Sequence, residues 1–457
     1  TLFEQLLDAK PEASKSAFFR KYSSFSQLEI DLLISEQNPT AAIEQAEFYK
    51  NRCLAWMLDG WQAEPKSPFL REIQDLLSPK TAIVYWHLGI ETLTTFIITQ
   101  RTDEPIVLSA DRQKQARQFS KWLGNYDSEY YSYAGKKPKA IKRLEEHPWR
   151  LSLTQRLSDL QRILKTANIC DQLPKDIEHL ILIPHRDLHR LFPEELTCTF
   201  LPSLKIGLQN QSEQPNPNIT PLLNVDDPLL DQSDMQFAQI ESAVIRTLSK
   251  EATTIPRVEA SSENVLSELT KGYKTFHFTG HGAYNSRRPS ESALGLADGP
   301  LTAKQINQLD LNSYQLVCLA ACETALTGKE GIPDEYVGLA SAFLKAGATN
   351  VLSTLWPVDE IASAWIMFRF YQELISGQIP AAALKTAQSW LQRVSYAELA
   401  SWLTQLSQLP GLPTLIKERL ESRVQNTLKD GSTIGLNQPT KYQHPYYWAA
   451  FTLTGQG

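Results

Sequence analysis

The sequence predicts an α/β protein with a mainly parallel β-sheet flanked by helices. In the second half of the chain, short apolar runs rich in β-branched residues alternate with segments of helical periodicity, which is the pattern of strands joined by crossover helices. A further apolar run at 179–184 is typical of a buried parallel strand. In such a sheet, catalytic and ligand sites lie beyond the carboxyl ends of the strands.

The first half of the chain begins with helices. Residues 1–78 place apolar side chains at helical spacing, so we expect a short all-helical segment that serves in docking. The runs 81–88 and 92–99 are rich in β-branched and aromatic residues and flank Gly89, which predicts a β-hairpin. Helical patterns return over 110–170.

The second half of the chain carries the regular alternation. We expect strands at 274–279, 315–320 and 350–356, and helices at 336–346, 361–375 and 381–394. Residues 209–234 are rich in Asn, Gln, Pro, Asp and Ser, which predicts a loop and a domain boundary. The expected domains are therefore a helical segment at 1–78, a first α/β half at 79–220 and a second α/β half at 221–457.

Composition excludes several classes of protein. Five cysteines among 457 residues are too sparse and too odd a set for a disulfide-framed secreted module, so we expect a reducing, cytoplasmic location. The formal net charge of −6 lacks the basic excess that nucleic-acid binding requires. No apolar run approaches the roughly 20 residues of a membrane helix, so neither a nucleic acid nor a membrane is an expected partner.

Two of the expected strand ends carry residues capable of chemistry. One strand runs into His281, which lies between Gly280 and Gly282, and the other runs into Cys322. If the two strands are neighbours, His281 can take the proton of the Cys322 thiol and leave a thiolate nucleophile. The backbone amides of Gly282 and Cys322 can then stabilise the oxyanion of a tetrahedral intermediate. This is the chemistry of acyl transfer.

A structural interpretation of the same residues also stands. Cysteine is among the most often buried residues, and we expect Cys318 to be a packing residue of this kind. Spacing alone leaves the catalytic and the structural interpretation of Cys322 about equally favoured. The stretch from His185 to His189 could suggest a metal site, but it lacks the pattern of zinc proteases. We therefore expect no metal and no organic cofactor.

The two strand-end motifs resemble the CHAT family of caspase-like cysteine proteases. The first is Thr-Phe-His-Phe-Thr-Gly-His-Gly at 275–282, and the second is Leu-Ala-Ala-Cys-Glu-Thr-Ala at 319–325. Further stretches that match the family in order lie at 183–193, 336–348, 351–360 and 444–455. The resemblance implies a caspase-type core in which His281 and Cys322 form the dyad and His277 is a structural strand residue.

The resemblance also implies a division of labour along the chain. Residues 79–220 would be a catalytically empty pseudo-caspase half, residues 221–457 the active protease domain, and the helices before residue 78 would adjoin tetratricopeptide repeats. The implied function is a cysteine endopeptidase that cleaves protein substrates. The alternative is a catalytically silent CHAT-fold scaffold for protein interaction, although the presence of both His281 and Cys322 favours the enzyme.

Two expectations concern specificity and control. Asp359 and Glu360 follow the third strand, where related caspase-like proteases bind a basic side chain, so they are candidates for the S1 pocket. An N-cap for the helix that begins near Ile361 is the alternative for these residues. We also expect that a regulatory partner which binds residues 1–78 reshapes the loop at 330–335 and aligns the dyad.

Overall fold

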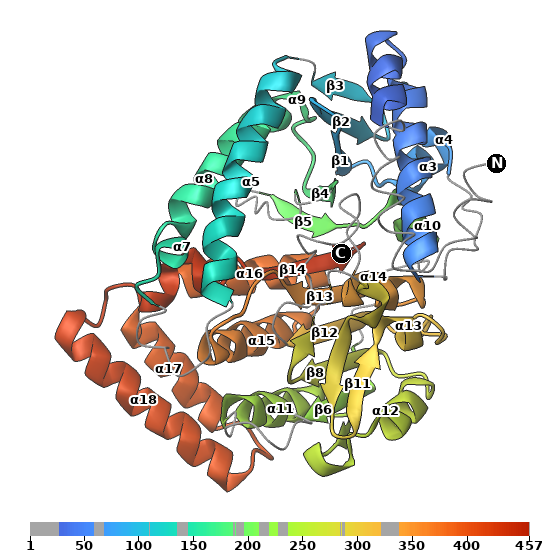
Figure 1. The fold of residues 1–457 in the computed structure, drawn as a ribbon. Coiled ribbons are helices and arrows are strands. Elements are labelled where there is room, and N and C mark those ends of the chain that lie inside the picture. Colours follow the sequence, from blue (N-terminus) through green and yellow to red (C-terminus); the bar gives the residue numbers. More distant parts are fainter. Residues whose placement is uncertain are drawn as a thin grey trace.

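A computed structural model gives the structure of the protein. It describes residues 27–58, 68–108, 110–134, 145–185, 188, 196–209, 219–226, 236–283, 285, 288–320 and 338–456. In this part of the chain, one long twisted sheet runs through the molecule and helices cover both of its faces (Figure 1). The fold class predicted from the sequence is confirmed.

The described strands form an eleven-stranded sheet and a small three-stranded sheet. In spatial order the large sheet contains β3 (Ile106–Leu108), β2 (Leu93–Thr99), β1 (Thr81–Leu88), β4 (His179–Ile183), β5 (Thr197–Phe200), β14 (Phe451–Gly455), β13 (Asn350–Thr354), β12 (Leu316–Ala320), β8 (Thr275–Thr279), β6 (Leu222–Asp226) and β7 (Ala252–Ile255). The small sheet contains β11 (Gly299–Thr302), β10 (Ala293–Leu296) and β9 (Gly282–Ala283).

The large sheet contains two parallel blocks that run in opposite directions, and the antiparallel strands β2 and β3 extend it beyond β1. Strands β1, β4, β5 and β14 are parallel to one another, and so are β13, β12, β8, β6 and β7. The blocks meet at an antiparallel pair in which Thr354 of β13 lies opposite Phe451 of β14. The carboxyl ends of the two blocks therefore lie at opposite edges of the sheet. His281 belongs to the edge formed by the second block.

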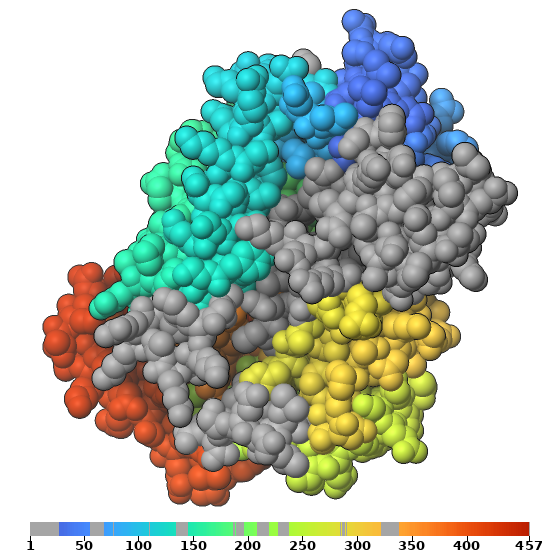
Figure 2. All heavy atoms as spheres, in the orientation of Figure 1, coloured from blue at the N-terminus to red at the C-terminus, as the bar shows by residue number. Residues whose placement is uncertain are grey.

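The described helices are divided between the two faces of the sheet. One face is covered by α5 (Arg112–Ala134), α8 (Leu153–Leu164), α11 (Gln236–Ser249), α15 (Glu360–Ile375) and α16 (Pro380–Arg393), with α7 (Pro148–Leu151), α9 (Thr166–Gln172), α17 (Tyr396–Ser407) and α18 (Thr414–Ile434) around them. The other face is covered by α3 (Pro39–Leu58), α4 (Leu70–Leu76), α10 (Leu204–Gln209), α12 (Ser262–Leu269), α13 (Ala303–Ile306) and α14 (Leu339–Lys345). Figure 2 shows α5 and α18 along one side of the molecule, away from the three-stranded sheet.

Alternation along each strand explains this two-sided core. Cys318 and Ala320 belong to the cluster under α11 and α15, whereas Val317 and Leu319 belong to the cluster under α12 to α14. Successive side chains of a strand point to opposite faces, so a strand covered on both sides needs apolar residues at nearly every position. All five residues of β12 are buried, which accounts for the continuous apolar runs in the sequence.

Most expected elements of the sequence are present. The hairpin at 81–99 pairs as expected, β4 is parallel to both of its neighbours, and the strands β8, β12 and β13 lie within the predicted ranges. The helix expected to stop at Gly347 ends at Lys345, and Gly347 adopts a φ of 114°, a left-handed conformation that glycine tolerates. Of the helical segment at 1–78, residues 1–26 and 59–67 lie outside the described part.

The loop expected over 209–234 is wrong for part of its length. Residues 222–226 form β6, which pairs in parallel with both β7 and β8. Its apolar residues Leu222, Leu223 and Val225 are fully buried, so burial on both faces outweighs the polar composition around them. Residues 210–218 and 227–235 lie outside the described part.

No helix in the described ranges is both long enough and apolar enough to cross a membrane.

Candidate active site

The carboxyl ends of β8 and β12 bring the two strand-end motifs together. The strands are parallel, and the register runs from Leu316 opposite Thr275 to Ala320 opposite Thr279. At the end of this ladder the Gly280 backbone N–H donates to the Ala320 carbonyl at 3.5 Å. His281 follows directly and is half-buried. Cys322 falls in 321–337, outside the described residues, as does the loop at 330–335.

The small sheet fixes the backbone around His281. The Gly295 N–H donates to the His281 carbonyl at 2.8 Å, and Gly282 lies opposite Leu294 in the antiparallel pair of β9 and β10. This bond joins the two residues that flank the Gly282–Leu294 pair, so the pair itself is of the non-hydrogen-bonded kind. The Gly282 N–H therefore points away from β10.

A group of buried polar side chains lies below His281. The His277 Nε2 lies 2.9 Å from the Thr279 hydroxyl and 3.2 Å from Glu241 Oε1. On the other side of the ring, Nδ1 lies 3.2 Å from the Tyr371 hydroxyl. Tyr371 is also hydrogen-bonded to Cys318, which lies opposite His277 in the register of the two strands. His277 is thus held on both sides of its ring within the sheet.

Cys318 has the properties of a packing residue. Its side chain is fully buried, and this burial raises the pKa of the thiol to about 12, against a lowering contribution from the hydrogen bond with Tyr371. The nucleophilic form of cysteine is the thiolate, so we expect this thiol to be unreactive in the folded protein. Sequence reasoning identified Cys318 as such a residue but did not find its partners Tyr371 and Glu241, which come from distant helices.

The two acidic residues after β13 both bind helix N-termini. Asp359 is the N-cap of α15, and its Oδ1 accepts a hydrogen bond from the Ala362 N–H at 3.0 Å. Glu360 Oε1 accepts from the Phe237 N–H at 2.7 Å, at the start of α11. Burial raises the pKa of Glu360, while its bonds to backbone N–H groups oppose that shift. Asp359 therefore makes the N-cap contact that the sequence offered as an alternative to an S1 role.

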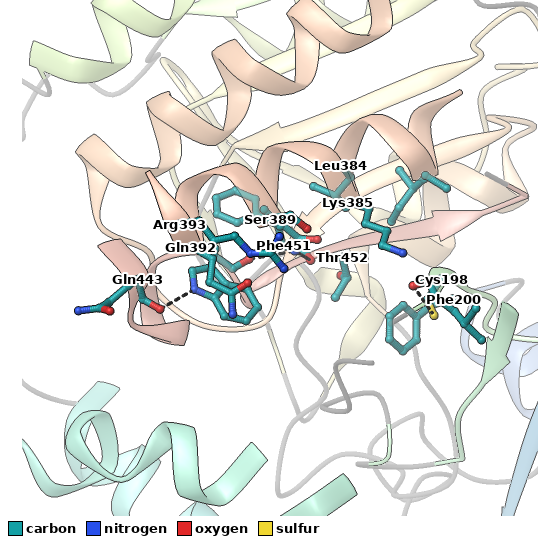
Figure 3. A pocket seen from close by; sticks show the side chains of 15 residues that line it. Cys198, Phe200, Leu384, Lys385, Ser389, Gln392, Arg393, Gln443, Phe451 and Thr452 are labelled. Carbon is teal, nitrogen blue, oxygen red and sulfur yellow. Dashed lines mark hydrogen bonds between the residues drawn. The ribbon is translucent and has the colours of Figure 1, made fainter. Parts of the chain in front are cut away.

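A cavity of about 370 Å³ lies elsewhere, where β5 meets β14 beneath α16. Figure 3 shows Lys385, Ser389 and Arg393 of α16 above Cys198 and Phe200 of β5. None of the residues that line the cavity belongs to β8, β9 or β12. The cavity is therefore separate from His281.

The stretch between His185 and His189 has a structural contact. The His185 Nδ1 accepts a hydrogen bond from the Leu88 N–H at 2.9 Å, and its ring stacks on His87 at 5.0 Å between centroids. His189 lies outside the described residues. Within the part that the structure describes, no three His, Cys, Asp or Glu side chains are grouped so as to hold a metal ion.

Comparison with known families and curated proteins gives two findings. A family model described as CHAT domain matches residues 161–456. Tetratricopeptide repeat protein 28 of Mus musculus is 39% identical over 92 residues, and the Homo sapiens protein of the same name is 36% identical over 92 residues. Each match covers 20% of this chain and 4% of the relative, so the chain spans a small fraction of these relatives' length.

Comparison with solved structures shows the fold. Two crystal structures of the Saccharomyces cerevisiae separase–securin complex match with TM-scores of 0.56 and 0.53, each at 11% identity. The first match covers 84% of this chain and 35% of the other, and the second covers 99% and 37%. The Arg-specific cysteine proteinase gingipain R matches with a TM-score of 0.36 at 10% identity, over 51% of this chain and 63% of the other. The fold is caspase-like, with a mostly parallel central sheet flanked by helices.

Proposed function

Because this chain belongs to the CHAT domain family, we propose that it is a caspase-like cysteine endopeptidase with His281 and Cys322 as its dyad. His281 is the general base and later the general acid, and Cys322 is the nucleophile. The backbone N–H groups of Gly282 and Cys322 form the oxyanion hole. The reaction uses these groups of the chain, with a protein as the substrate.

The register of β8 and β12 is the observation that carries this proposal. The last paired residues are Thr279 and Ala320, and the two proposed catalytic residues each follow two positions later, since 281 − 279 = 2 and 322 − 320 = 2. Two residues of chain span at most about 7 Å, and adjacent strands lie about 4.8 Å apart. Equal spacing from a shared register thus favours a contact between His281 and Cys322.

The chemical steps follow from these roles. His281 takes the proton of the Cys322 thiol, and the thiolate attacks the carbonyl carbon of the scissile peptide bond. The carbonyl oxygen becomes an oxyanion, which the two N–H groups stabilise, with Gly282 N–H already directed away from β10. His281 then gives its proton to the departing amine, which leaves an acyl-enzyme. Water, deprotonated by His281, hydrolyses the thioester and restores both residues.

Alkylation of the cysteines tests the dyad without knowledge of the substrate. Iodoacetamide is added to the native protein near neutral pH, and the modification of each cysteine is followed by mass spectrometry. Cys170 is exposed and serves as an internal reference. We expect Cys322 to react at least about tenfold faster than Cys170, because a paired histidine raises the fraction of thiolate, and His281→Ala to abolish that difference. If Cys322 reacts no faster than Cys170, the protein is a catalytically silent scaffold.

We further propose that Asp359 lines the S1 pocket and binds a basic side chain. It is half-buried at the carboxyl end of β13, on the same edge of the sheet as the ends of β8 and β12. A carboxylate at that place would favour Arg or Lys before the scissile bond, and Glu360 would add to the negative potential. Peptide libraries with Arg, Lys, Met or Asp at that position test this preference. Equal or better cleavage after Met would exclude an acidic S1 pocket.

The N-terminal helices are the proposed site of regulation by a partner protein. Helix α3 packs on the sheet through Lys50, whose Nζ donates to the Pro184 carbonyl at 2.8 Å, and it also contacts the short helix η4 (Pro289–Glu291). Helix η4 follows His281 and β9 in the chain. A partner that displaces α3 would therefore also displace the segment next to His281. A variant that begins at residue 79 lacks these helices. If it folds and keeps full, unregulated activity, this proposal is wrong.

A further inference from the structure

Five buried polar side chains connect the strands of the proposed dyad to the helices above them. We call this group the His277 network, and it consists of His277 and Thr279 of β8, Cys318 of β12, Glu241 of α11 and Tyr371 of α15. None of the five is more than 3% exposed. Polar groups buried to this degree are costly unless they are paired, so the geometry of the network is strongly constrained.

Glu241 and His277 form a buried pair at the centre of the network. The Thr279 hydroxyl donates to Glu241 Oε1 at 3.4 Å, so its oxygen is free to accept from the Nε2–H of His277 at 2.9 Å. A buried carboxylate is stabilised when its partner carries the compensating charge. The other charged groups nearby are acidic, namely Glu360, which acts electrostatically with Glu241, and Asp226, which lies opposite Thr279 in the sheet. Among these contacts the basic partner of Glu241 is His277, so the two side chains constrain each other's position.

The contacts of His277 continue on the other side of its ring to Tyr371 and Cys318. The His277 Nδ1 lies 3.2 Å from the Tyr371 hydroxyl. The Tyr371 hydroxyl is also hydrogen-bonded to Cys318, and burial raises the pKa of Cys318 against the smaller lowering effect of this bond. Tyr371 thus joins β8 to β12 through its single hydroxyl group.

The positions that Tyr371 joins are matched to the dyad. His277 and Cys318 are paired in the register, and each stands four residues before a dyad member, since 281 − 277 = 4 and 322 − 318 = 4. Tyr371 belongs to α15, which begins beside Asp359. The Tyr371 hydroxyl therefore links three elements. These are β12, which precedes the proposed nucleophile, β8, which precedes the proposed base, and α15, which begins directly after Asp359.

A second contact fixes α11 relative to α15. Glu360 at the start of α15 binds the Phe237 N–H at the start of α11, and Glu241 one turn further along α11 lies 3.2 Å from His277. Helices α11 and α15 are thus fixed to each other at one end and to β8 through His277. Productive geometry at a reacting centre tolerates little displacement. The contacts among α11, α15 and β8 therefore affect the geometry of the proposed dyad.

We infer that Tyr371 is a positioning residue of this site, which holds β8, β12 and α15 in the arrangement that brings His281 and Cys322 together. This inference rests on the proposed function, because it concerns the geometry of that dyad. Tyr371 does not touch the substrate and takes no part in proton transfer at the scissile bond. Its effect is exerted through His277 and Cys318.

The test compares two tyrosine variants. Tyr371→Phe removes the hydroxyl group and keeps the ring. Tyr314→Phe is the matched control, because Tyr314 is also fully buried and donates one hydrogen bond, to the Leu269 carbonyl at 3.0 Å. We expect both variants to lose similar stability. We expect only Tyr371→Phe to slow the alkylation of Cys322, by about tenfold, and to move the midpoint of its pH–rate profile upward, toward about 8.5, the pKa of an ordinary thiol.

The outcomes separate this inference from the proposed function. If Cys322 in the unmodified protein reacts no faster than Cys170, the dyad is absent and both fail. If the unmodified protein shows a fast Cys322 that His281→Ala removes, while Tyr371→Phe leaves its rate and pH profile unchanged, only the positioning role is overturned. Glu241→Gln is the second variant should Tyr371→Phe not fold. It removes the carboxylate that lies 3.2 Å from His277 Nε2, and we expect the same loss of Cys322 reactivity, whereas an unchanged rate contradicts the inference.

Discussion

Arg150 and Tyr447 join the two halves of the molecule through a buried hydrogen bond of 2.6 Å. Arg150 belongs to α7 in the first half of the chain, and Tyr447 lies just before β14 near its end. The guanidinium also stacks on the Tyr446 ring at 3.8 Å from its centroid. The pseudo-caspase half proposed at 79–220 thus shares a core with the proposed protease half.

Removal of this guanidinium is expected to destabilise the protein. The side chain of Arg150 is 10% exposed, and its charged hydrogen bond and cation–π contact contribute about 2 kcal/mol to the free energy of unfolding. We expect Arg150→Met to lower that free energy by about this amount in urea denaturation. Arg162→Met is the control, since the side chain of Arg162 is 71% exposed, and its loss is expected to stay within about 0.5 kcal/mol. Equal losses would show that the Arg150 contact contributes nothing.

Two substitutions at Asp359 separate its N-cap role from its proposed S1 role. Asp359→Ala removes the acceptor for the Ala362 N–H and should cost about 1 kcal/mol of stability. Asparagine is as good an N-cap as aspartate, so Asp359→Asn should be nearly as stable as the unmodified protein in urea denaturation. If Asp359 also binds a basic side chain, Asp359→Asn should lose the preference for Arg or Lys without loss of stability. A stable Asp359→Asn variant with unchanged peptide preference would contradict the S1 role and leave Asp359 with its N-cap role.

Glu360 is expected to make stability depend on pH. Its pKa is raised, mainly by burial. Because the folded-state pKa lies above the unfolded-state value, the folded state favours the protonated carboxyl. The resulting stabilisation is full below the unfolded-state pKa and is lost as pH rises through the folded-state pKa. Glu360→Gln keeps an oxygen that can accept from Phe237 N–H and cannot ionise.

We therefore expect the stability of Glu360→Gln, relative to the unmodified protein, to increase from about pH 4 to about pH 7. Urea denaturation at both pH values measures this difference. Glu263→Gln is the control, because Glu263 is exposed in the first turn of α12, and we expect its effect on stability to be small at both pH values. A relative stability of Glu360→Gln that falls as pH rises would contradict the assignment.

The parts of the fold that were predictable from the sequence are those with local signals. The hairpin around Gly89 and the strand β12 consist of continuous apolar or β-branched residues, so their periodicity alone identifies them. The strand β6 was missed because five residues between polar segments give too short a signal. Its identity depends on burial between β7 and β8, which only the folded chain provides.

The candidate site shows the same limit. His281 was singled out as a candidate because it lies between two glycines at a strand end. The partners of His277 were not found, because Glu241 lies 36 residues before it and Tyr371 lies 94 residues after it, since 277 − 241 = 36 and 371 − 277 = 94. One signal was available, namely that His277 alternates with Phe276 and Phe278 in a strand expected to be covered on both faces, because a buried imidazole needs partners for both nitrogens.

Cys318 is expected to report on global unfolding. It is fully buried, and burial raises the pKa of its thiol to about 12, so the native protein should hold it both inaccessible and protonated. In native buffer we expect iodoacetamide to modify the exposed Cys170 while Cys318 stays unmodified. With added urea, Cys318 should become reactive only as the protein unfolds, because β12 lies in the centre of the sheet. Modification of Cys318 in native buffer at the rate of Cys170 would show that β12 opens locally and that the frame around the dyad is not rigid.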